Sequence, residues 1–265
     1  MAGFTPTLRT QYMGKKLIHF SSIDSTNQYL MNDYEGPFQE GLVVVADHQT
    51  AGRGRLNHSW YSEPSESLLF SILVTPEVNV NLLPQLTQLC SLSITKVLED
   101  YCLLSPRIKW PNDIFLDEKK CCGVLCETVF DQPPSSKVTD DRKAPRVIVG
   151  IGLNVNQSVF PDEIKDIATS LYLETHRKWD RETLFSTILH SFEDYYEEWK
   201  NEKFPQLIEE IGLRFFLKGK IVDIISGPAT MRGVVVGLNS QGFLLVKDKD
   251  GNIVPILSGE VKLCS

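Results

Sequence analysis

Two arginines and two glycines alternate in one short segment that could bind an anion. The segment runs from Gln49 to Trp60 and reads QTAGRGRLNHSW, with its arginines at positions 53 and 55. Glycines let the backbone approach a ligand closely, and successive N–H groups in such a loop can form an anion-binding concavity. Arginine adds a planar, permanently charged fork that suits carboxylate or phosphate. Taken alone, the segment fits an anion-binding loop and a solvated basic turn equally well.

A lysine at the end of an apolar strand is the second candidate. Lys109 stands between Ile108 and Trp110 and is followed by Pro-Asn-Asp. One explanation is a lysine whose aliphatic stem packs on apolar surface while its ammonium reaches water. The other is a cation placed at a strand end to meet an anionic ligand.

Two further segments offer polar atoms or room for a ligand. Asp24-Ser25-Thr26-Asn27 opens a predicted helix, where Asp24 or Ser25 suits the N-cap and free backbone N–H groups can reach a ligand. Gly150 and Gly152 interrupt an apolar strand and alternate with its side chains, so both are expected on one face. Glycine inside a strand usually marks close approach by a ligand or another backbone.

These segments are positioned by an alternation of apolar strands and amphipathic helices. Strands are predicted at 17–20, 42–46, 68–74, 108–110, 114–116, 123–130 and 147–155. Helices are predicted at 24–33, 81–103, 161–168, 181–200 and 204–214, and residues 131–146 are predicted to be a surface loop. After residue 215, four short strands at about ten-residue spacing (220–224, 231–236, 243–246 and 253–256) predict a small barrel or sandwich.

Composition bounds the class of protein. The chain has 265 residues and a net charge of −7, which argues against non-specific nucleic-acid binding. No apolar run approaches the roughly 18 residues of a membrane span, and the N-terminus lacks the apolar core of a secretory signal. Six cysteines without a signal peptide indicate reduced thiols. Cys121, Cys122 and Cys126 are interpreted as buried strand residues, because no second cluster completes four zinc ligands.

Read together, four segments resemble the catalytic core of biotin–protein ligases, also called holocarboxylase synthetases. They are residues 24–27 (DSTN), 49–55 (QTAGRGR), 109–113 (KWPND) and 150–155 (GIGLNV), in this order and approximate spacing. Residues 120–127 and 168–171 look like the intermediate motifs of the same family, and the β tail is similar to its C-terminal domain.

The resemblance implies an α+β fold: a mixed β-sheet flanked by helices, as in class II synthetase-like cores, with a small C-terminal SH3-like β-barrel. The expected domains are residues 1–215, which bind biotin and ATP, and residues 216–265. Some members carry an N-terminal DNA-binding domain, but only about 16 residues precede the first strand here, so the form without that domain is expected. Many members have glycine at the position of Asn57 and a basic residue near His58.

The implied reaction has two steps. The carboxylate of biotin attacks the α-phosphate of ATP, giving biotinyl-5′-AMP and diphosphate. A lysine of a biotin carboxyl carrier domain then attacks this mixed anhydride, forming an amide and releasing AMP. Because two anions must meet, preplaced cations are needed. Mg²⁺ is expected on the phosphates, with Asn112 or Asp113 nearby but no ligand assigned.

Site residues are carried over position by position. Lys109 is predicted as the central catalytic cation, with Arg53 and Arg55 clamping the same anions. The predicted biotin-binding residues are Ser25, Thr26, Asn27, Gln49, Arg53, Gly54, Arg55, Lys109, Gly150 and Gly152. The predicted ATP-binding residues are Arg53, Arg55, Trp60, Asn112, Lys120 and Asn154. Trp60 is expected to pack on adenine and Asn154 to read its polar edge, whereas no general base is assigned.

The expected partners are biotin carboxyl carrier domains of carboxylases, with no nucleic acid or membrane, and a homodimer is left open. The expected location is the cytoplasm, and organelle targeting by the first residues also stays open. Lipoate–protein ligase is the nearest alternative, disfavoured because lipoate has no ureido ring for Ser25 to Asn27 and Gln49 to bind. A non-catalytic biotin-binding module would leave the cations unused. A Rossmann site is discarded because the third glycine is missing.

Overall fold

The computed structural model describes residues 3–130, 145–226 and 229–264, so nearly all of the predicted loop 131–146 lies outside the described residues. Its largest element is a seven-stranded sheet in the order β1-β2-β3-β7-β6-β5-β4. β1 and β2 are parallel, and all other neighbours are antiparallel. The strands are β1 (Leu17–Phe20), β2 (Val43–Ala46), β3 (Ser67–Val74), β4 (Arg107–Lys109), β5 (Asp113–Leu116), β6 (Lys119–Val129) and β7 (Arg146–Asn154).

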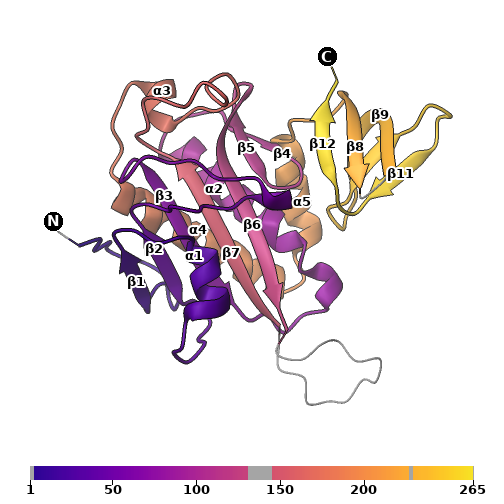
Figure 1. Ribbon diagram of the computed structural model, residues 1–265. Coiled ribbons are helices and arrows are strands. Elements are labelled where there is room, and N and C mark those ends of the chain that lie inside the picture. The colour runs from indigo at the N-terminus through magenta and orange to yellow at the C-terminus, as the bar shows by residue number, and fades with distance from the viewer. Residues whose placement is uncertain (1–2, 131–144, 227–228, 265) are drawn as a thin grey trace.

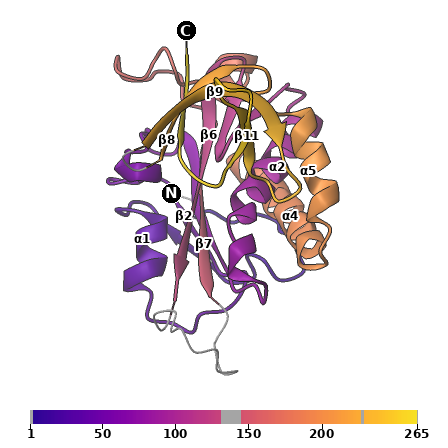
Figure 2. The same ribbon diagram turned by 90° about the vertical axis from the view of Figure 1, so that its right-hand side faces the viewer.

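Helices lie on both faces of this sheet. Figure 2 shows α2 (Gln85–Asp100), α4 (Arg181–Lys200) and α5 (Phe204–Leu213) on one face and α1 (Thr26–Gln28) on the other. Ser25 is the N-cap of α1, as predicted, and a π-helical turn at Tyr29–Asp33 follows it. The remaining helical elements are α3 (Leu171–Thr175) and the 3-10 turns at Arg55–Asn57 and Val80–Leu82.

The helix predicted at 161–168 is wrong, because this segment forms turns. The C-terminal end of this segment instead pairs with strand β6. The N–H of Lys120 donates to Ile167 O (2.8 Å), and the N–H of Thr169 donates to Lys120 O (2.9 Å). These bonds take the backbone groups that a second helical turn would need.

Strand alternation separates a core face from a site face. On β7, Val147, Val149, Ile151 and Leu153 point into the main core beneath α2 and α4, together with Phe70 and Ile72 of β3. Burying each such side chain contributes ~1.5–3 kcal/mol, so this face fixes the register of the sheet. The other face of β7 carries the two glycines and Asn154, and it is left for ligand contacts. Cys121 and Cys122 of β6 are fully buried, as predicted, whereas Cys126, also predicted to be buried, is partly exposed.

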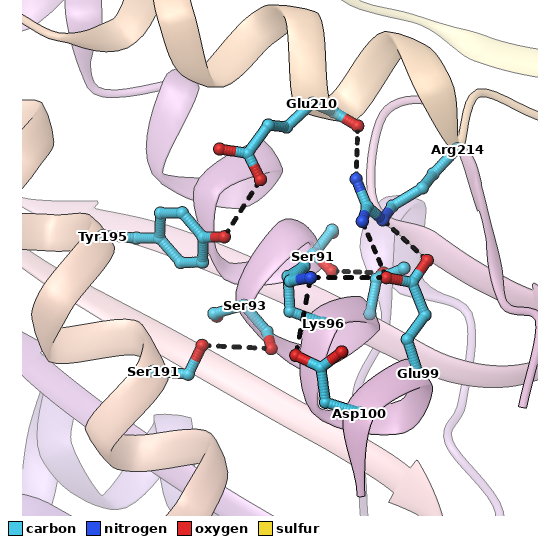
Figure 3. Close-up of polar contacts among 10 residues, drawn as sticks. Ser91, Ser93, Lys96, Glu99, Asp100, Ser191, Tyr195, Glu210 and Arg214 are labelled. Atoms are coloured by element: carbon cyan, nitrogen blue, oxygen red, sulfur yellow. Dashed lines mark hydrogen bonds and ion pairs between the residues drawn. The ribbon is translucent and has the colours of Figure 1, made fainter. Parts of the chain in front are cut away.

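Polar contacts tie the three helices to one another (Figure 3), and a backbone hydrogen bond links them to β4. Arg214 donates from Nε and Nη2 to the two carboxylate oxygens of Glu99 on α2 (2.7 Å each) and from Nη1 to Glu210 O (2.8 Å). Its own carbonyl accepts from the N–H of Ile108 on β4 (2.8 Å). The pair therefore anchors the strand that carries Lys109 to the helical layer.

A separate antiparallel sheet follows, in the order β11-β10-β9-β8-β12, and lies beside β4 and β5 in Figure 1. Its strands are β8 (Ile221–Ser226), β9 (Ala229–Leu238), β10 (Leu244–Lys247), β11 (Ile253–Ile256) and β12 (Glu260–Leu263). Its core includes Trp110 and Phe115 of the main unit, and Trp110 Nε1 donates to Gly242 O (3.1 Å). The predicted α+β class with a small β unit is confirmed, with five strands in that unit rather than four. In the described part of the chain, no helix has the length and apolarity to cross a membrane.

Candidate active site

A cavity of about 430 Å³ opens on the site face of the large sheet. Its walls are the start of α1, the loop 49–60, the site faces of β6 and β7, and the strand β12. All the predicted site residues except Asn154 line it. Asn154 lines a second cavity of about 120 Å³, which shares Ser59, Trp60 and Lys120 with the first.

The two glycines of β7 leave room for side chains of this chain. Gly150 pairs with Ser71 of β3 and Leu125 of β6, and a Cβ at Gly150 would lie 2.2 Å from Asn27 Oδ1. Gly152 pairs with Gly123 of β6, and a Cβ at Gly152 would lie 2.6 Å from Trp60 Cε2. Asn27 and Trp60 therefore rest on these strands where a side chain would otherwise stand. The prediction that both glycines share one face is confirmed.

Four polar side chains meet at the Asn27 end of the cavity. Gln49 Oε1 accepts from the N–H of Thr26 (2.8 Å) and lies 3.0 Å from the Thr26 hydroxyl. Ser71 Oγ lies 2.6 Å from both Thr26 Oγ1 and Asn27 Oδ1. Thr26, Asn27 and Ser71 are all buried. The group is held rigidly because each member has at least two polar neighbours.

The outer end of this group reaches an ion pair. Asn27 Nδ2 donates to Glu127 Oε2 (2.8 Å) on the site face of β6. Glu127 Oε1 accepts from Arg53 Nη2 (3.0 Å), and Arg53 Nη1 donates to Gln28 Oε1. The two ends of the Arg53 fork are thus engaged by Glu127 and Gln28.

Two other cations face the middle of the cavity. Burial lowers the pKa of Lys109 below its usual value, although the carboxylate of Asp113 opposes this shift. Burial also lowers the pKa of Arg55, again opposed by Asp113. Arg55 donates to Asn112 Oδ1 and to Gly259 O (3.3 Å each), and Lys120 pairs with Asp113 (2.6 Å). The negative charges of Asp113 and Glu260 raise the pKa of both cations and so partly offset the effect of burial.

The loop 49–60 folds back on itself as a short hairpin. The N–H of Trp60 donates to Gly52 O (2.9 Å), and the N–H of Gly54 donates to His58 O (2.7 Å). Leu56 at its tip has φ +52° and is 66% exposed. Positive φ is uncommon for leucine, so the tip adopts a left-handed turn with an apolar side chain in solvent.

In the second cavity, two buried polar atoms, Trp60 Nε1 and Asn154 Oδ1, have no hydrogen-bond partner among the described residues. Asn154 Nδ2 donates to Thr169 O (3.0 Å), which fixes the orientation of the amide. Asn154 Oδ1 is buried, and no group in the described ranges donates to it. Lys120 Nζ lies 5.4 Å from the centre of the Trp60 ring, so the indole and the ammonium together separate the two cavities.

Three parts of the site were not predicted from the sequence. Ser71 is a single hydroxyl inside the apolar strand at 68–74, and that break in the pattern was its signal. Glu127 lies two residues after Leu125, on the same face of β6. The third part, Glu260–Leu263, lines the cavity from the other sheet, and no sequence pattern connects it to the loop.

Known proteins match both sheets. A model of the biotin/lipoate A/B protein ligase family matches residues 19–139, and one of the biotin protein ligase C terminal domain matches residues 218–263. The bifunctional ligase/repressor BirA of Bacillus subtilis is 34% identical over 263 residues, covering 97% of this chain and 76% of the relative. The biotin–[acetyl-CoA-carboxylase] ligase of Mycobacterium tuberculosis is 28% identical, covering 96% of this chain and 93% of the relative.

A solved structure agrees with these matches. The biotin protein ligase from Aquifex aeolicus in complex with biotin and ATP has a TM-score of 0.80 to this chain at 36% identity, covering 94% of this chain and 99% of that one. Sequence, family models and fold therefore lead to one conclusion: the chain belongs to the biotin–protein ligase family.

Proposed function

We propose that this chain is an ATP-dependent biotin–protein ligase that forms biotinyl-5′-AMP and transfers biotin to a lysine of a biotin carboxyl carrier domain. Membership of the family and the fit of the two cavities to a cofactor acid and a nucleotide support this activity. One of the two matching models covers both biotin and lipoate ligases, and features of the site favour biotin independently of the relatives.

The observation that carries the choice is a shortage of protons among Thr26, Ser71, Asn27 and Gln49. These side chains make three oxygen–oxygen contacts, of Thr26 with Gln49, Ser71 with Thr26, and Ser71 with Asn27, but carry only two hydroxyl protons between them. Exchanging the oxygen and nitrogen of either side-chain amide does not supply a third proton. Gln49 Oε1 must accept the backbone N–H of Thr26, and Asn27 Nδ2 must face Glu127.

One of the three contacts therefore has no hydrogen between its oxygens, and an oxygen of that contact can accept from an N–H group of a ligand. The ureido ring of biotin has two N–H donors, whereas the dithiolane ring of lipoate has none. A hydrogen bond of this kind contributes ~0.5–1.5 kcal/mol net, so this end of the cavity favours biotin by about 2- to 13-fold per bond. Gly150 and Gly152 let Asn27 and Trp60 lie close against β7, and the biotin ring would lie in the cavity that these two side chains line.

The cations lie where the two anions would meet. Lys109 would contact the biotin carboxylate and the α-phosphate, and Arg55 would face the same phosphate from the loop. Both are partly desolvated, which strengthens their attraction for an anion. Arg53 is proposed as the third cation, although its fork is engaged by Glu127 and Gln28 in this structure.

The second cavity suits adenine. The unpartnered oxygen of Asn154 would accept a hydrogen bond from the exocyclic amine of adenine, whereas guanine and hypoxanthine present a carbonyl at that position. Trp60, which lines both cavities, would lie between the adenine and the biotin chain. Lys120 and Asn112 would border the phosphates.

Magnesium fits the site through one carboxylate. No group of three or more potential metal-ligating side chains occurs among the described residues, which agrees with an ion held mainly by phosphate oxygens and water. Asp113, which lines the cavity and pairs with Lys120, is the proposed protein ligand. When bound, Mg²⁺ neutralises phosphate charge. An Asp113→Asn variant should need more Mg²⁺ for half-maximal adenylation.

The acceptor and the assembly are also proposals. A carrier domain would present its lysine at the open side of the cavity, where the loop 49–60 and β12 meet. The division at residues 1–215 and 216–265, a homodimer, a cytoplasmic location and the lack of a nucleic-acid partner stay predictions. Light scattering of the purified chain would measure the oligomeric state.

One experiment tests the proposed function. The purified chain is given ATP, Mg²⁺ and either biotin or lipoate, and both AMP release and the mass of an added carrier domain are measured. Biotin-dependent AMP and the mass gain of one biotin are expected. AMP release that depends on lipoate instead would make the chain a lipoate ligase. An absence of AMP release with either acid would refute ligase activity.

A further inference from the structure

We infer that Glu127 is a positioning residue that ties the loop 49–60 to the ureido end of the cavity, so that biotin binding depends on a side chain that does not contact biotin. This inference rests on the proposed function. Glu127 is absent from the residues that line either cavity, yet it bonds to two residues that line the larger one.

Glu127 joins two donors from different segments of the chain. The carboxylate of Glu127 is shared: Oε2 accepts from Asn27 Nδ2 (2.8 Å) and Oε1 accepts from Arg53 Nη2 (3.0 Å). Its side chain is 19% exposed and that of Arg53 is 38% exposed. Two different donors on one carboxylate place the amide of Asn27 and the guanidinium of Arg53 in a fixed relation.

The contacts of Glu127 complete a closed ring of side-chain contacts. From Gln49 the contacts pass through Thr26, Ser71, Asn27 and Glu127 to Arg53, which is four residues from Gln49 in the same loop. The loop is thus held at its start by the Thr26 contacts and near its tip by Glu127. Breaking the ring at Glu127 leaves the start of the loop in place and leaves the guanidinium of Arg53 bonded to Gln28 alone.

Glu127 is expected to affect the binding of biotin more than the chemical step. Arg55 and Lys109, which face the middle of the cavity, have no contact with Glu127. Loss of the Glu127 carboxylate should therefore weaken the binding of the biotin ring while Lys109 and Arg55 stay in place. The expected signature is a rise in the KM for biotin that exceeds any change in kcat or in the KM for ATP, to which Arg53 contributes as the third proposed cation.

The test is Glu127→Gln, assayed by biotin-dependent AMP release. The amide oxygen of glutamine can still accept from Asn27, but its NH₂ group then faces the Arg53 guanidinium. We expect the KM for biotin to rise about fivefold, equivalent to ~1 kcal/mol. Asp223→Asn is the matched control, because Asp223 also pairs with an arginine, Arg232 (2.7 Å), but lies in the other sheet. The control should keep wild-type kinetics.

A double variant shows whether Glu127 acts through Arg53. Adding Glu127→Gln to Arg53→Gln should raise the KM for biotin no further than Arg53→Gln alone. Additive effects would overturn the inference, as would an unchanged KM in Glu127→Gln or a lower kcat at constant KM. The thermal midpoint of each variant is measured, and a Glu127→Gln variant that fails to fold would assign Glu127 to stability instead. Wild-type protein without biotin-dependent AMP would refute the proposed function, a result that does not depend on Glu127.

Discussion

Replacing Gly150 by alanine gives the sharpest test of how the site is built. The added methyl group would lie 2.2 Å from Asn27 Oδ1 and within 3 Å of Asn27 Cγ and Nδ2. Nonbonded carbon and oxygen atoms lie ~3.3 Å apart or more, so the amide must move by about 1 Å. That side chain is held by Ser71 (2.6 Å), Leu125 O (3.2 Å) and Glu127 (2.8 Å).

The magnitude follows from these bonds. A shift of this size breaks or lengthens at least two of them, and each contributes ~0.5–1.5 kcal/mol net, or more where a charge is involved. The loss is ~2–3 kcal/mol, which is a 30- to 150-fold weaker affinity if it falls on biotin binding. The KM for ATP should stay near the wild-type value, because Asn27 does not line the second cavity, which is proposed to hold adenine.

Two other glycines complete the assay. In Gly152→Ala, the methyl group would lie 2.6 Å from Trp60 Cε2 and displace the indole that borders both cavities, so the KM values for biotin and ATP should rise together. In Gly212→Ala on α5, the methyl group meets nothing within 4 Å, so activity should be unchanged and stability equal or up to ~1 kcal/mol higher. A Gly150→Ala variant with wild-type biotin kinetics would refute the placement of Asn27.

Three further predictions concern the cations, the nucleotide and the loop. Lys109→Ala should slow adenylation by ~10²–10³-fold while near-UV circular dichroism stays native, and a full rate would remove Lys109 from its role. Burial lowers the pKa of Lys109, so activity should fall as pH rises through a value below the ~10.4 of free lysine. In Lys109→Arg, this loss of activity should move to higher pH. A loss that stays at the wild-type pH would assign the titration to another group. Asn154→Ala should lose the preference for ATP over ITP, and a preserved preference would place the adenine elsewhere. Trypsin cleavage after Arg55 should slow when biotin and ATP are added together, whereas equal cleavage would argue against a loop that closes on ligands.

Three segments of the site stood out in the sequence because they break an apolar pattern at or inside a strand, whereas the resemblance to biotin–protein ligases implied the roles of their residues and added Asn112, Lys120 and Asn154. Lys109 ends a strand, Gly150 and Gly152 interrupt one, and the residues from Gln49 to Arg55 directly follow one. Such breaks are visible in the sequence because a strand has a regular pattern of side chains, and a residue that departs from this pattern stands out. The sheet and its helices were predictable for the same reason.

The parts that could not be predicted depend on contacts between distant segments. Glu127 meets Arg53 across 74 positions, and Gly259 meets Arg55 across 204. Strand β12 is four residues long and half polar, so only its pairing with β8 makes it a strand. The turns at 161–168 were mistaken for a helix because their pairing with Lys120 is equally non-local.

The wall that β12 provides also bears on the order in which the enzyme is made. One side of the cavity starts at Ser25, and the opposite side ends at Leu263. During synthesis on the ribosome, a nascent chain that ends at residue 215 already carries the loop, the cations and both glycines, but it lacks the β12 wall and the carbonyl that Arg55 contacts. Such a chain could hold biotin only in an open groove. The enclosed site, and with it protection of a water-sensitive anhydride, would arise only after residue 263 has emerged, which delays activity until synthesis is almost finished.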